Sequence, residues 1–179
     1  MWKIKYTWPL RKKSTCPKTG LILSAYKTYD NNKRIAAAQS HYMLWRKCAT
    51  LNRPILILEH DAIFIKKFDS KILEWWPGKG AVSINNPIGA TFSAKEYDAK
   101  LTNGINEVPW LTGNDVPQGL PGHSAYVIYP EAAKQVMKLQ DEIGWWPNDA
   151  IMCKQLCPWI RCYKPYLTEC QGIKSTTSK

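Results

Sequence analysis

Three consecutive polar residues, Glu59, His60 and Asp61, are the side chains in this sequence best suited to binding a ligand or a metal. They follow an apolar run at positions 55–58, which is too short for a lone helix. Bounded by Pro54 and rich in β-branched residues, the run predicts a buried strand of a parallel sheet with helices on either side. Ligands bind at the carboxyl ends of such strands, where these three residues lie.

Side chains alternate along a strand, so we expect Glu59 and Asp61 to share one side and His60 to point away. Two carboxylates that converge on one small volume repel each other and favour a hard divalent cation between or beside them. The pattern therefore predicts a metal site at Glu59 and Asp61. The alternative is a strand end followed by a turn with solvated acidic side chains.

The elements around this strand indicate an α/β sandwich in a single domain that spans residues 1–179. Apolar residues at three- and four-residue steps predict an amphipathic helix, in which His41 is expected to be a core or hydrogen-bonding residue. Apolar runs bounded by turn residues predict further strands, and Pro130 opens a second helix. The expected strands are 21–26, 55–58, 80–85, 124–129 and 159–163, and the expected helices are 33–50, 131–139 and a short one ending near residue 157.

Residues 86–122 are the longest irregular part of the predicted fold, and a segment of this length is expected to be a lid or binding loop over the site. Trp110, Asn114 and Asp115 are its most ligand-like side chains, and local backbone contacts are the alternative role for each. Outside this loop, Trp145 and Trp146 are suited to stacking on sugar or base faces, although core packing is the commoner use of tryptophan. Trp110, Asp115, Trp145 and Trp146 are the candidate acceptor-binding residues.

The charge of the chain favours an anionic partner, because 25 Lys and Arg residues outnumber 14 Asp and Glu residues and give a net charge of +11. Residues 1–20 are expected to form a basic arm, in which interleaved aromatic side chains suit stacking on nucleic acid. A solvated, frayed terminus is the alternative. Residues 164–179 are expected to include a polar tail after the last strand.

The sequence shows no signal peptide and no stretch of the roughly 20 apolar residues that a membrane span needs, so a cytoplasmic protein is expected. Peripheral attachment at the inner membrane face is compatible with the positive charge. Six cysteines in a cytosolic protein indicate thiols rather than disulfides. The four at positions 153, 157, 162 and 170 do not have the spacing of a paired CxxC zinc site and are expected to be buried thiols.

Five separated segments together resemble glycosyltransferase family 25, which contains lipooligosaccharide galactosyltransferases and the collagen galactosyltransferase domain. In chain order they are IAAAQSHYMLWRKC with a Ser-His pair, ILILEHDAIF with the polar triplet, GHSAYVIYPEAAKQVM with a Gly-x-x-x-Tyr pattern, WPNDAIM, and PYLTECQGIKSTTS. Each is short, but all follow the family's order. Two features differ: His60 stands at the middle of the family's Glu-Asp-Asp triplet, and the family's opening Asn-Leu strand with its following Arg is not clear in residues 1–30.

The resemblance implies a GT-A-like, Rossmann-like α/β/α sandwich, reduced in size, that transfers a sugar from a nucleotide-sugar donor to a hydroxyl acceptor with inversion. It implies that Asp61 holds Mn²⁺ or Mg²⁺ and that Glu59 contacts the metal or the ribose of a donor, for which a UDP-sugar is expected. His123 is expected to approach the diphosphate or add a metal ligand, with a turn histidine as the alternative. Asp149 is the candidate general base for the acceptor hydroxyl, although a helix N-terminus alone would also favour a carboxylate there.

The acceptor stays open at this stage. Bacterial relatives glycosylate lipooligosaccharide and animal relatives glycosylate hydroxylysine, while the basic arm also suits a hydroxymethylated base in DNA, the substrate of a phage enzyme in its host's cytoplasm. Two other classes also stay open: a non-catalytic nucleic-acid-binding protein on the same fold, and a metal-dependent nuclease that uses Glu59 and Asp61. The sequence predicts no particular oligomeric state.

Overall fold

The computed structural model describes residues 14–15, 22–23, 31–75, 80–90, 93–111, 120–143 and 146–172. Its main sheet has five described strands in the order β3-β7-β5-β8-β6. These are β3 (Ile55–Leu58), β5 (Ala81–Ser83), β6 (Gly104–Glu107), β7 (Ala125–Ile128) and β8 (Ile160–Lys164). Strands β5 and β8 are parallel, and the other neighbouring pairs in this sheet are antiparallel.

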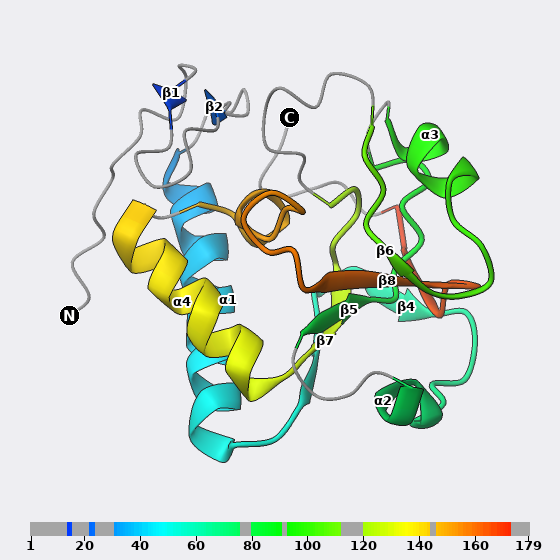
Figure 1. Ribbon diagram of the computed structural model, residues 1–179, viewed down its shortest axis with the longest axis horizontal. Coiled ribbons are helices and arrows are strands. Elements are labelled where there is room, and N and C mark those ends of the chain that lie inside the picture. Colours follow the sequence, from blue (N-terminus) through cyan, green and yellow to red (C-terminus); the bar gives the residue numbers. More distant parts are fainter. Residues whose placement is uncertain are drawn as a thin grey trace.

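Two long helices, α1 (Asn31–Leu51) and α4 (Pro130–Ile143), pack side by side against one face of the sheet (Figure 1). The inward face of α1 repeats at three- and four-residue steps, as expected for a helix that buries one stripe. Its buried apolar members are Ala38, Tyr42, Trp45 and Cys48. They join Ile57 of β3, Tyr126 and Ile128 of β7, and small residues of α4 in the larger core cluster. The short helix α5 (Asn148–Ile151) adds Ile151 to the same core.

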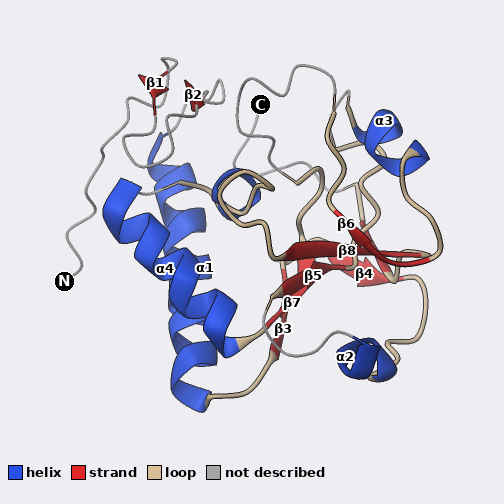
Figure 2. Ribbon diagram, in the orientation of Figure 1, coloured by secondary structure: helices blue, strands red, loops and turns tan. Residues whose placement is uncertain are grey.

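The opposite face of the sheet carries a smaller core cluster with Ile72 of α2 (Lys71–Trp75) and Leu167. Strand β4 (Ala62–Phe64) lies beside it and pairs antiparallel with β9 (Thr168–Cys170) in a separate two-stranded sheet. Figure 2 shows α2 and α3 (Ala94–Ala99) away from the α1 and α4 pair. The third sheet, which also has two strands, pairs β1 (Ser14–Thr15) with β2 (Ile22–Leu23).

The predicted α/β class is confirmed, and so are most of the predicted elements. Helices α1 and α4 cover the expected ranges 33–50 and 131–139, and Pro130 is the first residue of α4. Strands β3, β5, β7 and β8 lie within or overlap the four expected strands after residue 50. Of the strand expected at 21–26, the structure describes only Ile22–Leu23, which pairs with β1. The single-domain assignment stays a prediction.

One prediction about β3 is wrong. The strand was expected to be buried on both faces within a parallel sheet, but it is antiparallel to β7 and lies at the edge of the described sheet. Ile57 is 2% exposed, whereas Leu56 and Leu58 are 36% and 41% exposed. Because alternate residues of a strand point to opposite faces, the described residues cover only the face of β3 that points toward α1.

The expected irregular segment 86–122 contains regular structure, namely α3 and β6. Strong helix formers explain α3, and Lys100, the residue that follows the helix, pairs with Glu96 one turn earlier. The expected tail 164–179 likewise contains β9, which pairs with β4. Residues 112–119, including Asn114 and Asp115, lie outside the described residues, as does almost all of the basic arm 1–20.

All five cysteines of the described residues are free thiols, as predicted. Cys153, Cys157 and Cys162 are buried as expected, but Cys170 is exposed because it ends β9 in the small sheet. Within the part of the chain that the structure describes, no helix is both long enough and apolar enough to cross a membrane.

Candidate functional site

A buried chain of hydrogen bonds links α1, β7 and the end of β3. The Nδ1 atom of His41 lies 2.8 Å from the hydroxyl of Tyr126, which also accepts a hydrogen bond of 2.8 Å from Nε1 of Trp45. On the other side of the His41 ring, Nε2 lies 3.1 Å from Oε1 of Glu59. His41, Trp45 and Tyr126 are all at most 6% exposed, so the hydrogen bonds among these three side chains are shielded from water.

The local sequence explains why these four side chains meet. His41 and Trp45 are four residues apart on a helix and therefore share its inward face. In the register of β3 and β7, Ile57 lies opposite Tyr126. Glu59 is two residues after Ile57 and still bonded to β7, through a 2.8 Å hydrogen bond from its N–H to the Ser124 carbonyl. Its side chain therefore points to the same side as Ile57, toward α1.

The default prediction for His41, a core or hydrogen-bonding residue, is confirmed. The sequence analysis missed its contact with Glu59. The spacing of His41 and Trp45 was a signal for one polar stripe on α1, but nothing local indicated that residues 41, 59 and 126 converge.

His123 is the second buried histidine of the site. Its ring is 2% exposed and stacks on that of Tyr126, with the ring centres 4.2 Å apart and the planes 18° apart. Burial, with a smaller contribution from nearby His41, lowers the pKa of His123 from 6.5 to about 3. The ring is therefore neutral at physiological pH and carries one N–H donor. Neither ring nitrogen has a hydrogen-bond partner among the residues that the structure describes, which is rare for a buried polar group.

The backbone around His123 is fixed by contacts from two other elements. Gly122 adopts a φ of +59°, where a side chain would be strained, and a Cβ there would lie 3.3 Å from Ala90 and from Asn86. Asn85, just after β5, donates to the Gly122 carbonyl at 2.8 Å. Asn148, the first residue of α5, donates to the His123 carbonyl at 3.1 Å. These contacts fix the position of the His123 backbone, so His123 is not an unconstrained turn residue.

Asp61 lies in the turn between β3 and β4. The Ala62 N–H donates to the Glu59 carbonyl at 3.1 Å, so the chain turns at 59–62 and strand alternation does not extend to Asp61. The geometric premise for placing the two carboxylates on one side is therefore wrong, and their convergence stays a prediction. The Asp61 backbone is held by the Gln171 N–H at 2.9 Å, while its Oδ1 atom is buried and has no hydrogen-bond partner within the described part of the chain.

The described residues contain no group of three or more His, Cys, Asp and Glu side chains arranged to enclose a metal ion. Two carboxylates still have oxygen atoms to offer: Oδ1 of Asp61 has no partner, and Glu59 uses only Oε1 for its hydrogen bond to His41. Mg²⁺ in nucleotide-dependent enzymes is commonly held by one or two carboxylates together with water and substrate phosphates. Glu59 and Asp61 are therefore each the kind of ligand that such a metal takes, and the described residues do not form a cage made by protein alone.

Asp149 lies in the first turn of α5, as predicted from the sequence. It is half-buried, and its backbone carbonyl accepts a 2.9 Å hydrogen bond from the Leu120 N–H. Because Asn148 bonds to His123, the same short helix holds Asp149 and the backbone of the buried histidine.

The four candidate acceptor-binding residues have different positions. Trp110 is 46% exposed, and the Lys154 ammonium lies 5.1 Å from the centre of its ring. Trp146 is 6% exposed within the larger core cluster, which is the commoner use of tryptophan. Asp115 and Trp145 lie outside the described residues.

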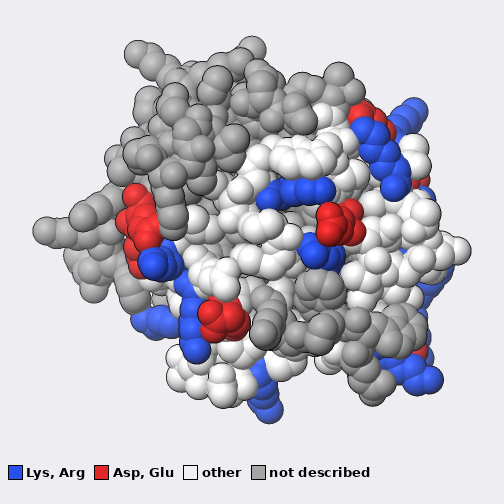
Figure 3. Space-filling model, in the orientation of Figure 1, with Lys and Arg blue, Asp and Glu red and all other residues white. Residues whose placement is uncertain are grey.

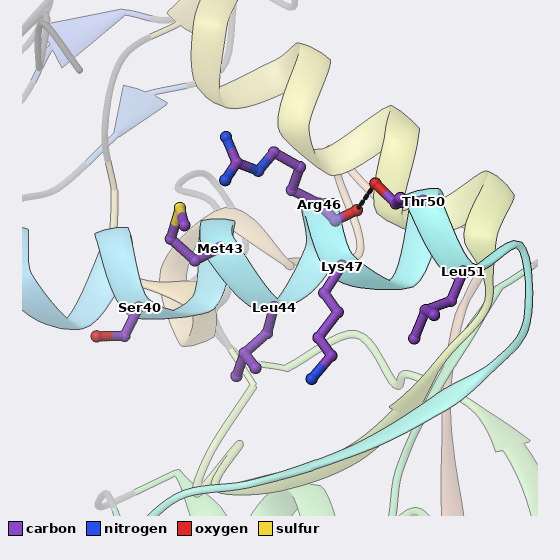
Figure 4. Close-up of a pocket in the computed structure, with 7 residues that line it drawn as sticks. All are labelled: Ser40, Met43, Leu44, Arg46, Lys47, Thr50 and Leu51. Atoms are coloured by element: carbon purple, nitrogen blue, oxygen red, sulfur yellow. Dashed lines mark hydrogen bonds between the residues drawn. The ribbon is translucent and has the colours of Figure 1, made fainter. Parts of the chain in front are cut away.

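A shallow hollow of about 600 Å³ lies elsewhere, on the outward side of α1. Figure 4 shows Ser40, Leu44, Lys47 and Leu51 as one stripe of this surface, with Thr50 donating a hydrogen bond to the Arg46 carbonyl. None of the predicted site residues lines it. Ser40 of the Ser-His pair faces outward here and bonds to the Ala36 carbonyl, whereas His41 faces the core.

The structure is that of a mixed α/β protein with a buried polar cluster at the end of β3. Residues 27–78 match the family model of glycosyltransferase family 25, described as an LPS biosynthesis protein. The matched segment holds α1, β3 and the turn with Asp61, and it covers less than half of the chain. Among curated proteins, none matches the chain. The match supports the resemblance to family 25 in this segment and, with it, glycosyltransferase activity.

Proposed function

We propose that this protein is a metal-dependent glycosyltransferase that moves a sugar from a UDP-sugar to a hydroxyl acceptor with inversion. One observation carries the proposal: Asp61 and His123 both have buried polar atoms without partners, at the strand end inside or beside the matched segment. The hydrogen bond between the Glu59 N–H and the Ser124 carbonyl brings the two segments together. Buried polar atoms without partners are costly, and a bound ligand is a common reason for their presence.

In this proposal, Asp61 and Glu59 hold Mn²⁺ or Mg²⁺, with Glu59 also able to reach the ribose of the donor. When bound, the cation neutralises the negative charge that develops on the leaving diphosphate. Asp61 suits this role because its Oδ1 atom has no competing hydrogen bond. Glu59 suits it because His41 already fixes one of its two carboxylate oxygens.

His123 would donate its ring N–H to an oxygen of the donor's diphosphate. Its lowered pKa keeps the ring neutral, so it acts as a hydrogen-bond donor rather than as a positive charge. The stack on Tyr126 and the bonds to Gly122 and the His123 carbonyl hold the ring before any ligand arrives. A donor held in place in advance costs no reorganisation during the reaction.

Asp149 is the proposed general base, which takes the proton from the acceptor hydroxyl as the oxygen attacks the anomeric carbon. The contact between α5 and the His123 segment supports this assignment, because it keeps Asp149 on the element that is tied to the donor side of the site. The exposed ring of Trp110 is a proposed contact for the acceptor.

We favour a glycan acceptor, because the matched family is described as one of LPS biosynthesis. A lipid-linked glycan at the inner membrane face would suit the net charge of +11. A hydroxymethylated DNA base is the alternative, and it would suit the excess of basic residues in 1–34. On the face shown in Figure 3, basic and acidic side chains of the described residues are mixed. Glu107 forms ion pairs with both Lys154 and Arg161. This mixed surface is less suited to a DNA backbone than a continuous basic groove.

The test is the release of nucleotide diphosphate from a panel of nucleotide sugars, without acceptor, in Mn²⁺ and in EDTA. We expect slow, Mn²⁺-dependent release that Asp61→Ala abolishes. Glu131→Gln, which changes an exposed acid on α4, should keep the wild-type rate. If no nucleotide sugar binds or is hydrolysed while duplex DNA binds with a steep salt dependence, the protein is a nucleic-acid-binding module. Mn²⁺-dependent cleavage of the DNA would indicate a nuclease.

A further inference from the structure

The hydrogen-bond chain from Trp45 to Glu59 has a direction that the positions of the heavy atoms determine. The indole N–H of Trp45 can only donate, so the Tyr126 hydroxyl accepts from it at 2.8 Å. The hydroxyl still has its own hydrogen to donate, and Nδ1 of His41 lies 2.8 Å away. If Nδ1 accepts that hydrogen, the ring proton of His41 is on Nε2 and points at the Glu59 carboxylate 3.1 Å away.

The other two protonation states of His41 leave a group without a partner. With the proton on Nδ1 alone, the bare Nε2 lone pair faces a carboxylate oxygen, so two acceptors meet. With protons on both nitrogens, Tyr126 receives two donors and its own hydrogen has no acceptor among the described residues. Tyr126 is 0% exposed, so water does not replace that acceptor. Only the Nε2–H form satisfies every member of the chain.

We infer that His41 is a positioning residue, held by Tyr126 and Trp45 so that its Nε2–H points at Glu59, and that it orients the carboxylate of Glu59 toward its ligand. The inference rests on the proposed function for what Glu59 binds. His41 itself touches no substrate: it is 5% exposed, and Glu59 stands at the end of the chain.

The geometry gives this role a physical consequence. Of the four residues that these hydrogen bonds join, Glu59 is the one that is not fully buried: 34% of its side chain is exposed, and His41 holds its Oε1 atom. Oε2 is thereby left to face a metal ion or a ribose hydroxyl. Hydrogen-bond partners of this kind commonly change metal affinity or activity by about tenfold to a hundredfold when they are removed.

The first test determines which ring nitrogen of His41 carries the proton. This measurement does not depend on activity. Long-range ¹H–¹⁵N spectra of the full chain distinguish a proton on Nε2, on Nδ1 or on both, and the chain has only three histidines to assign. We expect the Nε2–H form for His41, identified by the signals that His41→Gln removes. Tyr126→Phe, which removes only the hydroxyl, should change the signal of Nδ1, because that nitrogen loses the hydroxyl that donates to it, while Glu59 keeps the proton on Nε2. A proton on Nδ1 or on both nitrogens in the wild type overturns the inference.

The second test uses UDP with Mn²⁺ as the probe. His41→Gln retains one acceptor for Tyr126 and one donor for Glu59, so we expect UDP affinity in Mn²⁺ within about threefold of wild type. His41→Leu should weaken it by about tenfold to a hundredfold. Ser40→Ala, on the outward side of α1, is the matched control and should have no effect. Thermal unfolding checks that each variant is folded, and Tyr126→Phe gives a second variant if His41→Leu is not.

The outcomes separate this inference from the proposed function. If the wild type binds UDP in Mn²⁺ and folded His41→Leu or Tyr126→Phe binds it equally well, the positioning role is wrong while the glycosyltransferase proposal stands. If the wild type does not bind UDP in Mn²⁺ at all, the proposed function fails and the role of His41 in it fails as well.

Discussion

The buried imidazole of His123 links the architecture of the site to the stability of the protein. Its pKa of about 3 lies below the value of 6.5 that an unburied histidine has. Between these two values the unfolded chain binds a proton that the folded chain does not bind. The free energy of unfolding therefore falls as the pH falls through this window, and His123 costs no stability by this route above it.

We predict a measurable loss from this one residue. In EDTA, between pH 7 and pH 5, the wild type should lose about 2 kcal/mol more stability than His123→Phe, which keeps an aromatic ring beside Tyr126 but cannot titrate. Urea unfolding at the two pH values measures the difference. His60→Asn, in the exposed turn after β3, is the control and should lose as much as the wild type. An identical loss in His123→Phe would show that His123 is not buried as a neutral ring.

From their positions relative to strands and helices, Glu59, Asp61, His123 and Asp149 were predicted as site residues, and these assignments stay predictions. Sequence reasoning missed Tyr126 and Trp45 as polar partners, because aromatic residues in a strand and a helix are usually packing residues. The contact between His41 and Tyr126 joins residues 85 positions apart, so no local pattern contains it. Tertiary pairing, not composition, joins Trp45, Tyr126, His41 and Glu59 into one chain of hydrogen bonds.

Gln140, a buried side chain of α4, bonds to the backbone just before α5. Gln140 is 0% exposed and bonds to both polar groups of the Trp146 backbone: its amide donates to the carbonyl at 2.7 Å, and its Oε1 accepts from the N–H at 3.0 Å. Trp146 lies two residues before α5, the helix that carries Asp149. Gln140 therefore helps to set where the proposed base lies.

We predict that Gln140→Leu lowers the free energy of unfolding by about 3 kcal/mol, because two buried backbone groups lose their partners. Gln135→Leu is the matched control: it makes the same change on the same helix at an exposed position and should change stability by less than about 0.5 kcal/mol. Urea unfolding measures both variants. Equal stability of the two would mean that the Trp146 backbone finds other partners when Gln140 is absent.

Elements were predictable where local sequence specifies them. Residues 81–83, 125–128 and 130–143 combine apolar or periodic runs with clear turn residues, and each was found as β5, β7 or α4. Strands β4 and β9 were missed because each has three residues and gains its stability from pairing across more than a hundred positions. The edge position of β3 was missed because an all-apolar run looks the same in an interior strand and in an edge strand.

In the molecule as a whole, hydrogen bonds connect the end of β3 with the segment of the buried His123, and connect that segment with the short helix α5. Helix α1 supplies His41, β3 supplies Glu59, and the α5 contacts hold His123 and Asp149. The match to family 25 covers α1 and β3. The remaining site residues come from the C-terminal half of the chain, and their contribution is what an experiment on the whole protein has to establish.

The most direct test is the dependence of UDP binding on Mn²⁺, measured by calorimetric titration of the full chain with and without EDTA. We predict that Mn²⁺ tightens UDP binding by about tenfold or more, which corresponds to about 1.4 kcal/mol or more, and that Asp61→Asn removes this gain while remaining folded. Equal UDP affinity with and without Mn²⁺, or an unchanged Mn²⁺ effect in Asp61→Asn, would contradict the proposed metal and donor site.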